Sequence, residues 1–264
     1  MRWTNNEIEL LRRDYVDKGE FCLSSVLNRS PNAIRIMASR DGISKLAYRK
    51  DIKLSESEKQ IILGGLFGDL YSRIKDKCKN ARIEGAHCKK QEKYLLWKVN
   101  MLKSLSFNLR RNKLGYLSFE SRRFPCLNYY HNLFYKNGKK EVTRQILDLV
   151  DRLGLAVWYM DDGSYKKRDR NCTLHTNGFT YAENLVIKEW FEEKWSIFPS
   201  ICSNTDPKRH PGKRWHYLYF GTKEAEKFIS LIKDYIHPSM LYKIGVFKKE
   251  LNGGGFYGKK GRSK

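Results

Sequence analysis

The chain contains two apolar segments that each end on an acidic residue, IILGGLFGD at 61–69 and GLAVWYMDD at 154–162. Apolar side chains surround each segment instead of forming one stripe, so each is expected to be a helix buried between other elements. Glycine inside a helix costs about 1 kcal/mol relative to alanine. The small residues inside the two segments are Gly64, Gly65, Gly68, Gly154 and Ala156. Their presence predicts that the two helices pack backbone to backbone.

The regions that follow the two segments resemble each other in outline, which predicts a duplicated architecture. Each segment is followed by strand-like stretches and by a helical stretch that contains Trp97 in the first copy and Trp190 in the second. Repetition of this kind is typical of a diverged internal duplication. In such an architecture, Asp69 and Asp162 would meet at a shared helix end, close to a pseudo-two-fold axis. Charge at the edge of a core is costly unless a cation or a chemical task holds it there.

Residues 1–46 are expected to form a small domain of three short helices, followed by a polar and basic linker at 47–54. A turn at Lys18-Gly19 is expected between the first two helices, and Ser30-Pro31 opens the third. The third helix is basic, and a short three-helix unit of this kind is typical of a helix-turn-helix. The arrangement W-T-x-x-E with RSPNAIR resembles a Myb-like or resolvase-like DNA-binding domain. A plain helical cap on the next domain is the alternative.

The charge balance predicts a polyanionic partner. The 264 residues include 52 Lys and Arg against 29 Asp and Glu, a formal net charge of +23 at pH 7. Nucleic acid is the first candidate, with a merely basic soluble protein as the alternative. The six cysteines form no C-x-x-C pair, so free thiols in a reducing compartment are expected.

Neither a membrane span nor a signal peptide is expected from the sequence. No apolar run approaches the ~20 residues that a span needs, and the N-terminus carries early acids without a small-residue cleavage site. No membrane partner is therefore expected. The cytoplasm of a bacterial or phage-infected cell is the expected location, with an organelle as the alternative.

The two acid-ending segments together resemble the paired motifs of LAGLIDADG homing endonucleases, in the single-chain form with two motifs. LAVWYMDDG fits the subgroup that carries W-[FY]-M-D-D-G, whereas the first segment keeps the acid but has Leu70 where the family name ends in glycine. AHCKKQEKYLLWKVNML resembles the segment after the first strands of the family, and YIHPSMLYKI resembles its closing segment. The resemblance covers roughly residues 54 to 250.

This resemblance implies an α+β fold of two pseudo-symmetric αββαββα lobes, preceded by the small three-helix domain. The first lobe would occupy residues 55–150 and the second lobe residues 151–251. A flexible basic tail would follow at 252–264. The single-chain form implies a monomer.

The resemblance also implies an active site for phosphodiester hydrolysis in DNA. The residue before the last position of each motif is the family's metal ligand, which selects Asp69 and Asp162. Mg²⁺ prefers oxygen ligands and often takes only one or two carboxylates, so Mg²⁺ (or Mn²⁺) is the expected cofactor. Asp161 is left as a capping, hydrating or assisting residue, with direct ligation of the metal as the alternative. Each lobe of the subgroup contributes a catalytic lysine, which selects Lys243 and Lys140, with Lys139 as the rival of Lys140.

Double-stranded DNA is the implied partner, with strands of each lobe lying in its major groove as in other β-ribbon readers. Because side chains alternate across a strand, about half of the strand candidates are expected to be wrong. The candidates for DNA contact are Arg35, Arg40, Arg82, His87, Arg122, Arg123, His175, Asn177, Lys208, Arg209, Lys213, Arg214 and His216, with Glu84 and Tyr217 as further groove-facing residues.

The function that follows is that of a site-specific homing endonuclease, which makes a staggered double-strand break in a long DNA target by metal-dependent hydrolysis. Two alternatives use the same basic surface. One is a maturase that binds intron RNA, and the other is a DNA-binding regulator that has lost catalysis. The two intact motif acids, Asp69 and Asp162, argue against the regulator.

Overall fold

The computed structural model describes residues 3–43, 52–75, 78–205 and 211–246. The chain divides into two compact units, Met1–Ile52 and Lys53–Lys264. The tail expected at 252–264 and most of the expected linker lie outside the described residues. Among the described helices, none is long and apolar enough to cross a membrane.

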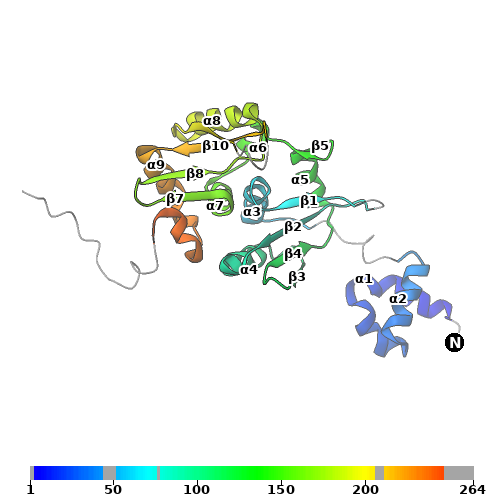
Figure 1. The fold of residues 1–264 in the computed structure, drawn as a ribbon. Coiled ribbons are helices and arrows are strands. Elements are labelled where there is room, and N and C mark those ends of the chain that lie inside the picture. Colours follow the sequence, from blue (N-terminus) through cyan, green and yellow to red (C-terminus); the bar gives the residue numbers. More distant parts are fainter. Residues whose placement is uncertain (1–2, 44–51, 76–77, 206–210, 247–264) are drawn as a thin grey trace, which may run out of the picture. The chain divides into compact units, whose positions relative to one another are not determined.

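The described part of the N-terminal unit contains two helices, α1 (Asn5–Leu27) and α2 (Pro31–Arg40) (Figure 1). Ser30 caps α2 at the place expected from Ser30-Pro31. The turn expected at Lys18-Gly19 is wrong, because α1 continues through both residues. Leu11, Tyr15 and Leu23 keep one buried face across this position and pack with Ile34 and Ala38 of α2. That packing outweighs the helix cost of one glycine, about 1 kcal/mol.

The second unit contains the same order of elements twice. The first series is α3 (Glu56–Phe67), β1 (Tyr71–Arg73), β2 (Arg82–His87), α4 (Glu92–Met101), β3 (Phe107–Arg111), β4 (Leu117–Ser121) and α5 (Cys126–Phe134). The second series is α7 (Arg152–Asp162), β7 (Gly163–Lys166), β8 (Asn171–Leu174), α8 (Tyr181–Trp195), β9 (Ser200–Thr205), β10 (Arg214–Phe220) and α9 (Thr222–Ile232).

Shorter elements complete the two series. These are η1 (Lys89–Gln91), β5 (Tyr135–Lys136), β6 (Lys139–Lys140), α6 (Arg144–Asp148), η2 (Lys233–Tyr235) and η3 (Pro238–Ile244). We call the elements from α3 to α6 the first lobe and those from α7 to η3 the second lobe.

Each lobe is built on a four-stranded antiparallel sheet. The strand orders are β1-β2-β4-β3 in the first lobe and β7-β8-β10-β9 in the second, so the two sheets have corresponding topologies. Glu84 of β2 lies opposite Glu120 of β4, and Leu174 of β8 lies opposite Leu218 of β10. One face of each sheet packs on helices, because Phe119 and Leu218 of the central strands are buried.

Helices α3 and α7 lie side by side between the two sheets (Figure 1). A Cβ atom added at Gly64 would lie 2.0 Å from the carbonyl oxygen of Gly154, so the two backbones are in direct contact there. Next to this contact, the rings of Phe67 and Trp158 stack with their centroids 4.4 Å apart. The backbone-to-backbone packing expected from the small residues is confirmed.

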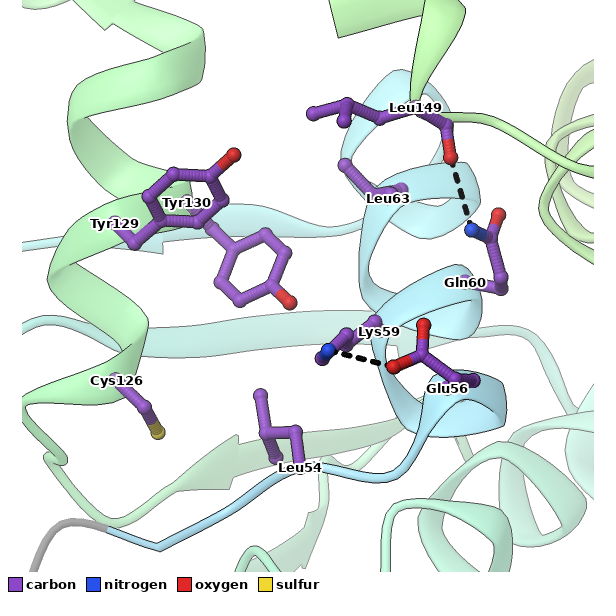
Figure 2. A pocket seen from close by; sticks show the side chains of 9 residues that line it. All are labelled: Leu54, Glu56, Lys59, Gln60, Leu63, Cys126, Tyr129, Tyr130 and Leu149. Atoms are coloured by element: carbon purple, nitrogen blue, oxygen red, sulfur yellow. Dashed lines mark hydrogen bonds and ion pairs between the residues drawn. The ribbon is translucent and has the colours of Figure 1, made fainter.

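A glutamine fixes the beginning of this helix pair. Gln60 Nε2 donates to the carbonyl oxygen of Leu149 at 2.9 Å, and the amide of Asp151 donates to Gln60 Oε1 at 2.9 Å. Figure 2 shows Gln60 reaching Leu149 from α3, beside a pocket that Tyr129 and Tyr130 of α5 line from the other side. The second lobe is thus tied to the first where α7 begins.

Replacing Gly64 by alanine should destabilise the lobe junction. The new methyl group would overlap the carbonyl of Gly154, and overpacking of this kind costs typically about 1–3 kcal/mol. We expect the free energy of unfolding, measured by urea denaturation, to fall by that amount. The matched control is Gly178→Ala, because nothing lies within 4 Å of a Cβ atom there. Equal effects of the two substitutions would contradict the close approach of the helices.

Candidate active site

Three carboxylates lie where α3 and α7 end. Asp69 follows Gly68, the C-cap residue of α3, whereas Asp161 and Asp162 are the last two residues of α7. The C-terminal end of a helix carries partial negative charge, so carboxylates there are electrostatically unfavourable. Helix stability therefore does not explain why the chain places acids at these two ends.

Asp161 is engaged entirely by the protein. Its side chain is 0% exposed, and Oδ1 accepts a hydrogen bond from Lys98 Nζ of α4 at 2.7 Å. Oδ2 accepts a hydrogen bond from the backbone amide of Asp69 at 3.1 Å. Gly68 leaves room for this carboxylate, because a Cβ atom at Gly68 would lie 2.5 Å from Asp161 Cβ. Asp161 therefore joins the end of α7 to the end of α3.

Asp69 and Asp162 carry charge that the protein compensates only in part. The Asp69 side chain is 38% exposed, and burial, followed by the Asp161 charge, raises the pKa of its carboxyl. Burial raises the pKa of Asp162 to about 7, with further contributions from Asp161 and Asp69. Carboxylate oxygens with excess negative charge are the donors that Mg²⁺ and Mn²⁺ prefer. The residues present therefore fit a divalent cation.

Two lysines, one from each lobe, reach the same helix ends. Lys140 Nζ donates to the carbonyl oxygen of Leu70 at 3.1 Å, and burial lowers its pKa to about 8. Lys243 Nζ donates to the carbonyl oxygens of Met160 and Asp161 at 2.6 and 2.9 Å, and burial lowers its pKa as well. The rival Lys139 is exposed on β6. The structure thus brings together all four residues expected to be catalytic, while their chemical roles stay predictions.

His87 belongs to this cluster and not to the open face of the first sheet. Its side chain is 1% exposed, and its Nδ1 lies 3.5 Å from Asp69 Oδ2 and 3.2 Å from Gln91 Oε1. One ligand atom each from His87, Asp69 and Asp161 lies within 4.8 Å of the others. The groove-facing position expected for His87 is wrong, because His87 shares the buried face of β2 with Ile83. Burial, followed by the Lys98 charge, lowers the pKa of His87 to about 4.

Lys98 was missed by sequence reasoning, and no pattern in the sequence identifies it. Lysine in a helix is usually at the surface, but the Lys98 side chain is 0% exposed. For His87 a signal did exist, because alternation along β2 from Ile83 places His87 on the core side.

The open face of the first sheet carries an ionic network. Arg82 pairs with Glu84 of its own strand, and its Nη1 lies 2.7 Å from Glu120 Oε2 of β4. Glu84 also accepts a hydrogen bond from the hydroxyl of Tyr71. Arg82 separates two glutamates that lie directly opposite each other, an arrangement that would otherwise be repulsive. Arg82 therefore lies on the face expected for it, but as part of this network.

The second sheet presents aromatic residues on its open face. Tyr217 and Tyr219 of β10 line a shallow pocket together with Ser164 and Thr173. His216 instead has the parity of the buried Leu218, and its ring contacts Tyr181 of α8 with centroids 5.1 Å apart. The groove-facing position expected for His216 is therefore wrong by strand alternation. Arg214 has the same parity but is exposed at the start of β10, so its contact with DNA stays a prediction.

The remaining candidates for DNA contact lie at the ends of strands, in loops and in the N-terminal unit. His175 is exposed just beyond β8, with Nε2 3.0 Å from Ser164 Oγ. Lys208 and Arg209 lie outside the described residues. Of the others, Arg122 and Lys213 are exposed near strand ends, Arg123 and Asn177 are half-buried, and Arg35 and Arg40 are exposed on α2. Contacts of all these residues with DNA stay predictions.

The fold and the site together define a two-lobed α+β protein with acidic helix ends at its lobe junction. A family model described as the LAGLIDADG DNA endonuclease family matches residues 59–228, more than half of the chain. The chain therefore belongs to this family, which confirms the resemblance seen in the paired motifs.

The relatives of this chain include RecA proteins and intron-encoded endonucleases. Protein RecA of Mycolicibacterium flavescens is 29% identical over 200 residues, covering 73% of this chain and 47% of the relative. The chain spans about half the length of the RecA relatives that it matches. Intron-encoded endonuclease ai4 of Dictyostelium discoideum is 33% identical over 129 residues, covering 48% of this chain and 76% of the relative. Probable intron-encoded endonuclease 1 of Wickerhamomyces canadensis is 28% identical over 216 residues, covering 75% of this chain and 88% of the relative.

A solved structure of the homing endonuclease I-WcaI bound to its DNA recognition sequence has a similar fold. The TM-score is 0.63 at 23% sequence identity, with 73% of this chain and 88% of that chain covered. This similarity supports the mixed α/β fold with antiparallel sheets.

Breaking the buried pair of Lys98 and Asp161 should destabilise the protein strongly. Loss of one partner from a buried ion pair costs about 3–5 kcal/mol, and we expect Lys98→Met to lower the free energy of unfolding by that amount. The double substitution Lys98→Gln with Asp161→Asn should recover most of it, because two neutral amides can bond to each other. Lys227→Met is the control, since its pair with Glu224 is partly exposed and is expected to contribute less than about 1 kcal/mol. Equal losses at both lysines in urea denaturation would contradict the buried pair.

Asp162 should make metal-free stability depend on pH. Its pKa is about 7 in the folded chain and about 4 when unfolded, so ionisation favours unfolding. Its contribution to stability is complete below about pH 4 and is lost as the pH rises through about 7. In EDTA, Asp162→Asn should therefore unfold at a higher temperature than the native chain at pH 8, with a smaller difference at pH 5. The exposed Asp234→Asn serves as the control, and parallel calorimetric curves for the native chain and Asp162→Asn across this range would refute the prediction.

Proposed function

We propose that the chain is a site-specific homing endonuclease that cuts both strands of a long duplex target by divalent-metal-dependent hydrolysis. The observation that carries the proposal is the convergence of Asp69, Asp162, Lys140 and Lys243 at one junction between two sheets. Membership of the LAGLIDADG DNA endonuclease family supports it. So do the names of the two intron-encoded endonucleases among the relatives.

In this proposal, Asp69 and Asp162 hold Mg²⁺ or Mn²⁺ through carboxylate oxygens. The bound cation supplies electrostatic stabilisation of the oxygens that attack and leave phosphorus. The two carboxylates come from two lobes that we take to be related by a pseudo-two-fold axis. Such a pair suits a duplex, whose two strands are also related by a two-fold axis.

Lys140 and Lys243 each bring an ammonium group to the helix ends that carry the two acids. Ammonium groups aimed at a phosphate stabilise the charge that develops in the transition state. The pKa of about 8 at Lys140 Nζ allows this group to hold or release a proton close to neutral pH. Lys243 Nζ is oriented by two carbonyl oxygens.

The open faces of the two sheets form the proposed DNA-binding surface. The net charge of +23 suits a polyanion, and the similar I-WcaI structure is described as bound to its DNA recognition sequence. On the first sheet, Arg82 and Glu120 offer a donor and an acceptor to base edges. On the second sheet, Tyr217 and Tyr219 offer aromatic rings and hydroxyls. We take the N-terminal unit to be a helix-turn-helix-like domain whose exposed Arg35 and Arg40 add a tethered contact and raise the effective concentration.

The proposal is tested by cleavage of a defined target. Purified protein is incubated with the uninterrupted allele of the host gene, or with a target recovered by selecting cut ends from a randomised duplex library. We expect one discrete cut in Mg²⁺ and none in EDTA. Asp69→Asn and Asp162→Asn should each lower the rate by about 100-fold or more, because each removes charge stabilisation from the transition state. Asp234→Asn should cut like the native chain.

Two other outcomes would contradict the endonuclease. Tight and specific DNA binding without cleavage, unaffected by Asp69→Asn and Asp162→Asn, would favour the inactive regulator. Neither cutting nor DNA binding would direct the search to intron RNA. Light scattering of the same preparation tests the proposed monomer, since a stable dimer would conflict with two lobes in one chain.

A further inference from the structure

We propose that Asp161 is a positioning residue for Asp69. Lys98 holds the Asp161 side chain in place, and Asp161 in turn holds the backbone of Asp69. Of the two motif acids, Asp69 therefore has a support that Asp162 does not share. The contacts that carry this inference lie within the protein, whereas its consequence for cleavage rests on the proposed function. Two contacts across the junction between the lobes are involved. One is the ionic contact of Lys98 with Asp161, and the other is the hydrogen bond of Asp161 with the Asp69 amide.

The first contact runs from the first lobe to the second. Lys98 of α4 reaches Asp161 at the end of α7, with 2.7 Å between Nζ and Oδ1 and both side chains 0% exposed. Charge-assisted bonds of this kind are short and strong, and an unpaired carboxylate at this depth would be very costly. Lys98 therefore fixes the orientation of the Asp161 side chain.

The second contact runs back from the second lobe to the first. Asp161 Oδ2 accepts a hydrogen bond from the Asp69 amide at 3.1 Å. That amide directly follows the end of α3, where the chain leaves the helix and has no intrahelical partner to set its direction. The bond holds the Asp69 backbone, and hence the start of its side chain, against the end of α7. Because Oδ1 and Oδ2 each already accept a bond from the protein, the proposal gives Asp161 a positioning role and leaves metal binding to Asp69 and Asp162.

His87 lies next to both Asp69 and Asp161. Its ring lies between the two carboxylates, with Nδ1 3.5 Å from Asp69 Oδ2 and Nε2 4.0 Å from Asp161 Oδ1. Because the ring is buried and bonded to Gln91, it limits how far either carboxylate can rotate.

The first motif has no counterpart of Asp161. Gly68 occupies the corresponding position, one residue before Asp69 as Asp161 stands one residue before Asp162. The two positions face each other, since a Cβ atom at Gly68 would lie 2.7 Å from Asp161 Oδ2. Only one of them can carry a side chain. Gly68 of the first motif therefore provides the space that the Asp161 side chain of the second motif fills. Through this contact the second lobe positions Asp69, the acid of the first lobe.

This asymmetry predicts unequal effects on the two DNA strands. Loss of the hydrogen bond to the Asp69 amide should lower the cleavage rate of the strand that depends on Asp69 more than that of the strand that depends on Asp162. A misplacement of about 1 Å at a reacting centre can cost about 100-fold. The native chain should cut both strands at similar rates, and variants without the bond should accumulate a singly nicked duplex.

Two double variants separate positioning from folding. Lys98→Gln with Asp161→Asn removes both charges but keeps an oxygen that can accept from the Asp69 amide. Lys98→Met with Asp161→Leu also removes both charges but leaves no acceptor. Both avoid a lone buried charge, so both are expected to fold, with unfolding temperatures measured first. Lys227→Met is the surface control.

The first readout needs neither metal nor DNA. Amide hydrogen exchange is followed by NMR in protein labelled with ¹⁵N-aspartate, with the Asp69 signal assigned through Asp69→Asn. We expect protection of the Asp69 amide in the native chain, in Lys227→Met and in the Asn double variant, and loss of protection in the Leu double variant. Equal protection in both double variants would overturn the proposal whatever the protein does to DNA.

The second readout is the rate of cleavage of each strand, measured with a separate label on each. The Leu double variant should slow one strand by about 100-fold more than the other, and the Asn double variant should restore the native ratio. A native ratio in the Leu double variant would show that Asp161 is merely structural and would overturn the proposal. If the native chain cuts no DNA while the exchange result holds, the positioning of Asp69 stands and the proposed endonuclease fails.

Discussion

The direct contact between the backbones of α3 and α7 determines the geometry of the whole second unit. Gly64 and Gly154 allow the helices to approach so closely that any larger residue would separate them. The approach brings the two helix ends together, and the side chains around it, led by Phe67 and Trp158, form the core at the junction. The sheets then lie on either side, because each lobe continues outward from its own helix. The positions of the acids follow from this one contact.

The cost of this geometry is concentrated charge at the helix ends. Asp69, Asp161 and Asp162 lie at the unfavourable end of the helix dipoles, and burial raises the pKa of Asp69 and of Asp162. Lys98 pairs with Asp161 and offsets part of the charge of Asp69. Lys243 and Lys140 offset part of the charge of Asp162. The negative charge that remains at Asp69 and Asp162 suits a divalent cation, and such a cation would in turn attract a substrate phosphate. The same residues that weaken the fold without metal would therefore make the site chemically useful.

Local patterns predicted the two apolar helices and the acids at their ends, and the family resemblance selected the two lysines. The apolar segments, the small residues inside them and the flanking matches led to Asp69, Asp162, Lys140 and Lys243, which the structure places together. Longer-range features were not predictable in the same way. The burial of Lys98 depends on a partner more than sixty residues away.

The expectations that the structure contradicts have two different physical origins. Alternation along each strand, counted from Ile83 and Leu218, places His87 and His216 on the buried face of the sheet and not on the groove-facing one. The turn expected at Lys18-Gly19 was overridden by packing against α2, a tertiary effect that local propensity does not contain. The pairing of Gly68 with Asp161 became visible only once the two helix ends were placed against each other.

A crystal structure of the protein with a target duplex and Mn²⁺ would examine the site most directly, because anomalous scattering locates the ions without assumption. Ions bonded to the carboxylates of Asp69 and Asp162 and to the scissile phosphates, with Asp161 still bonded to Lys98, are the predicted result. DNA bound away from the two sheets, or ions bonded to Asp161 with Lys98 displaced, would contradict it.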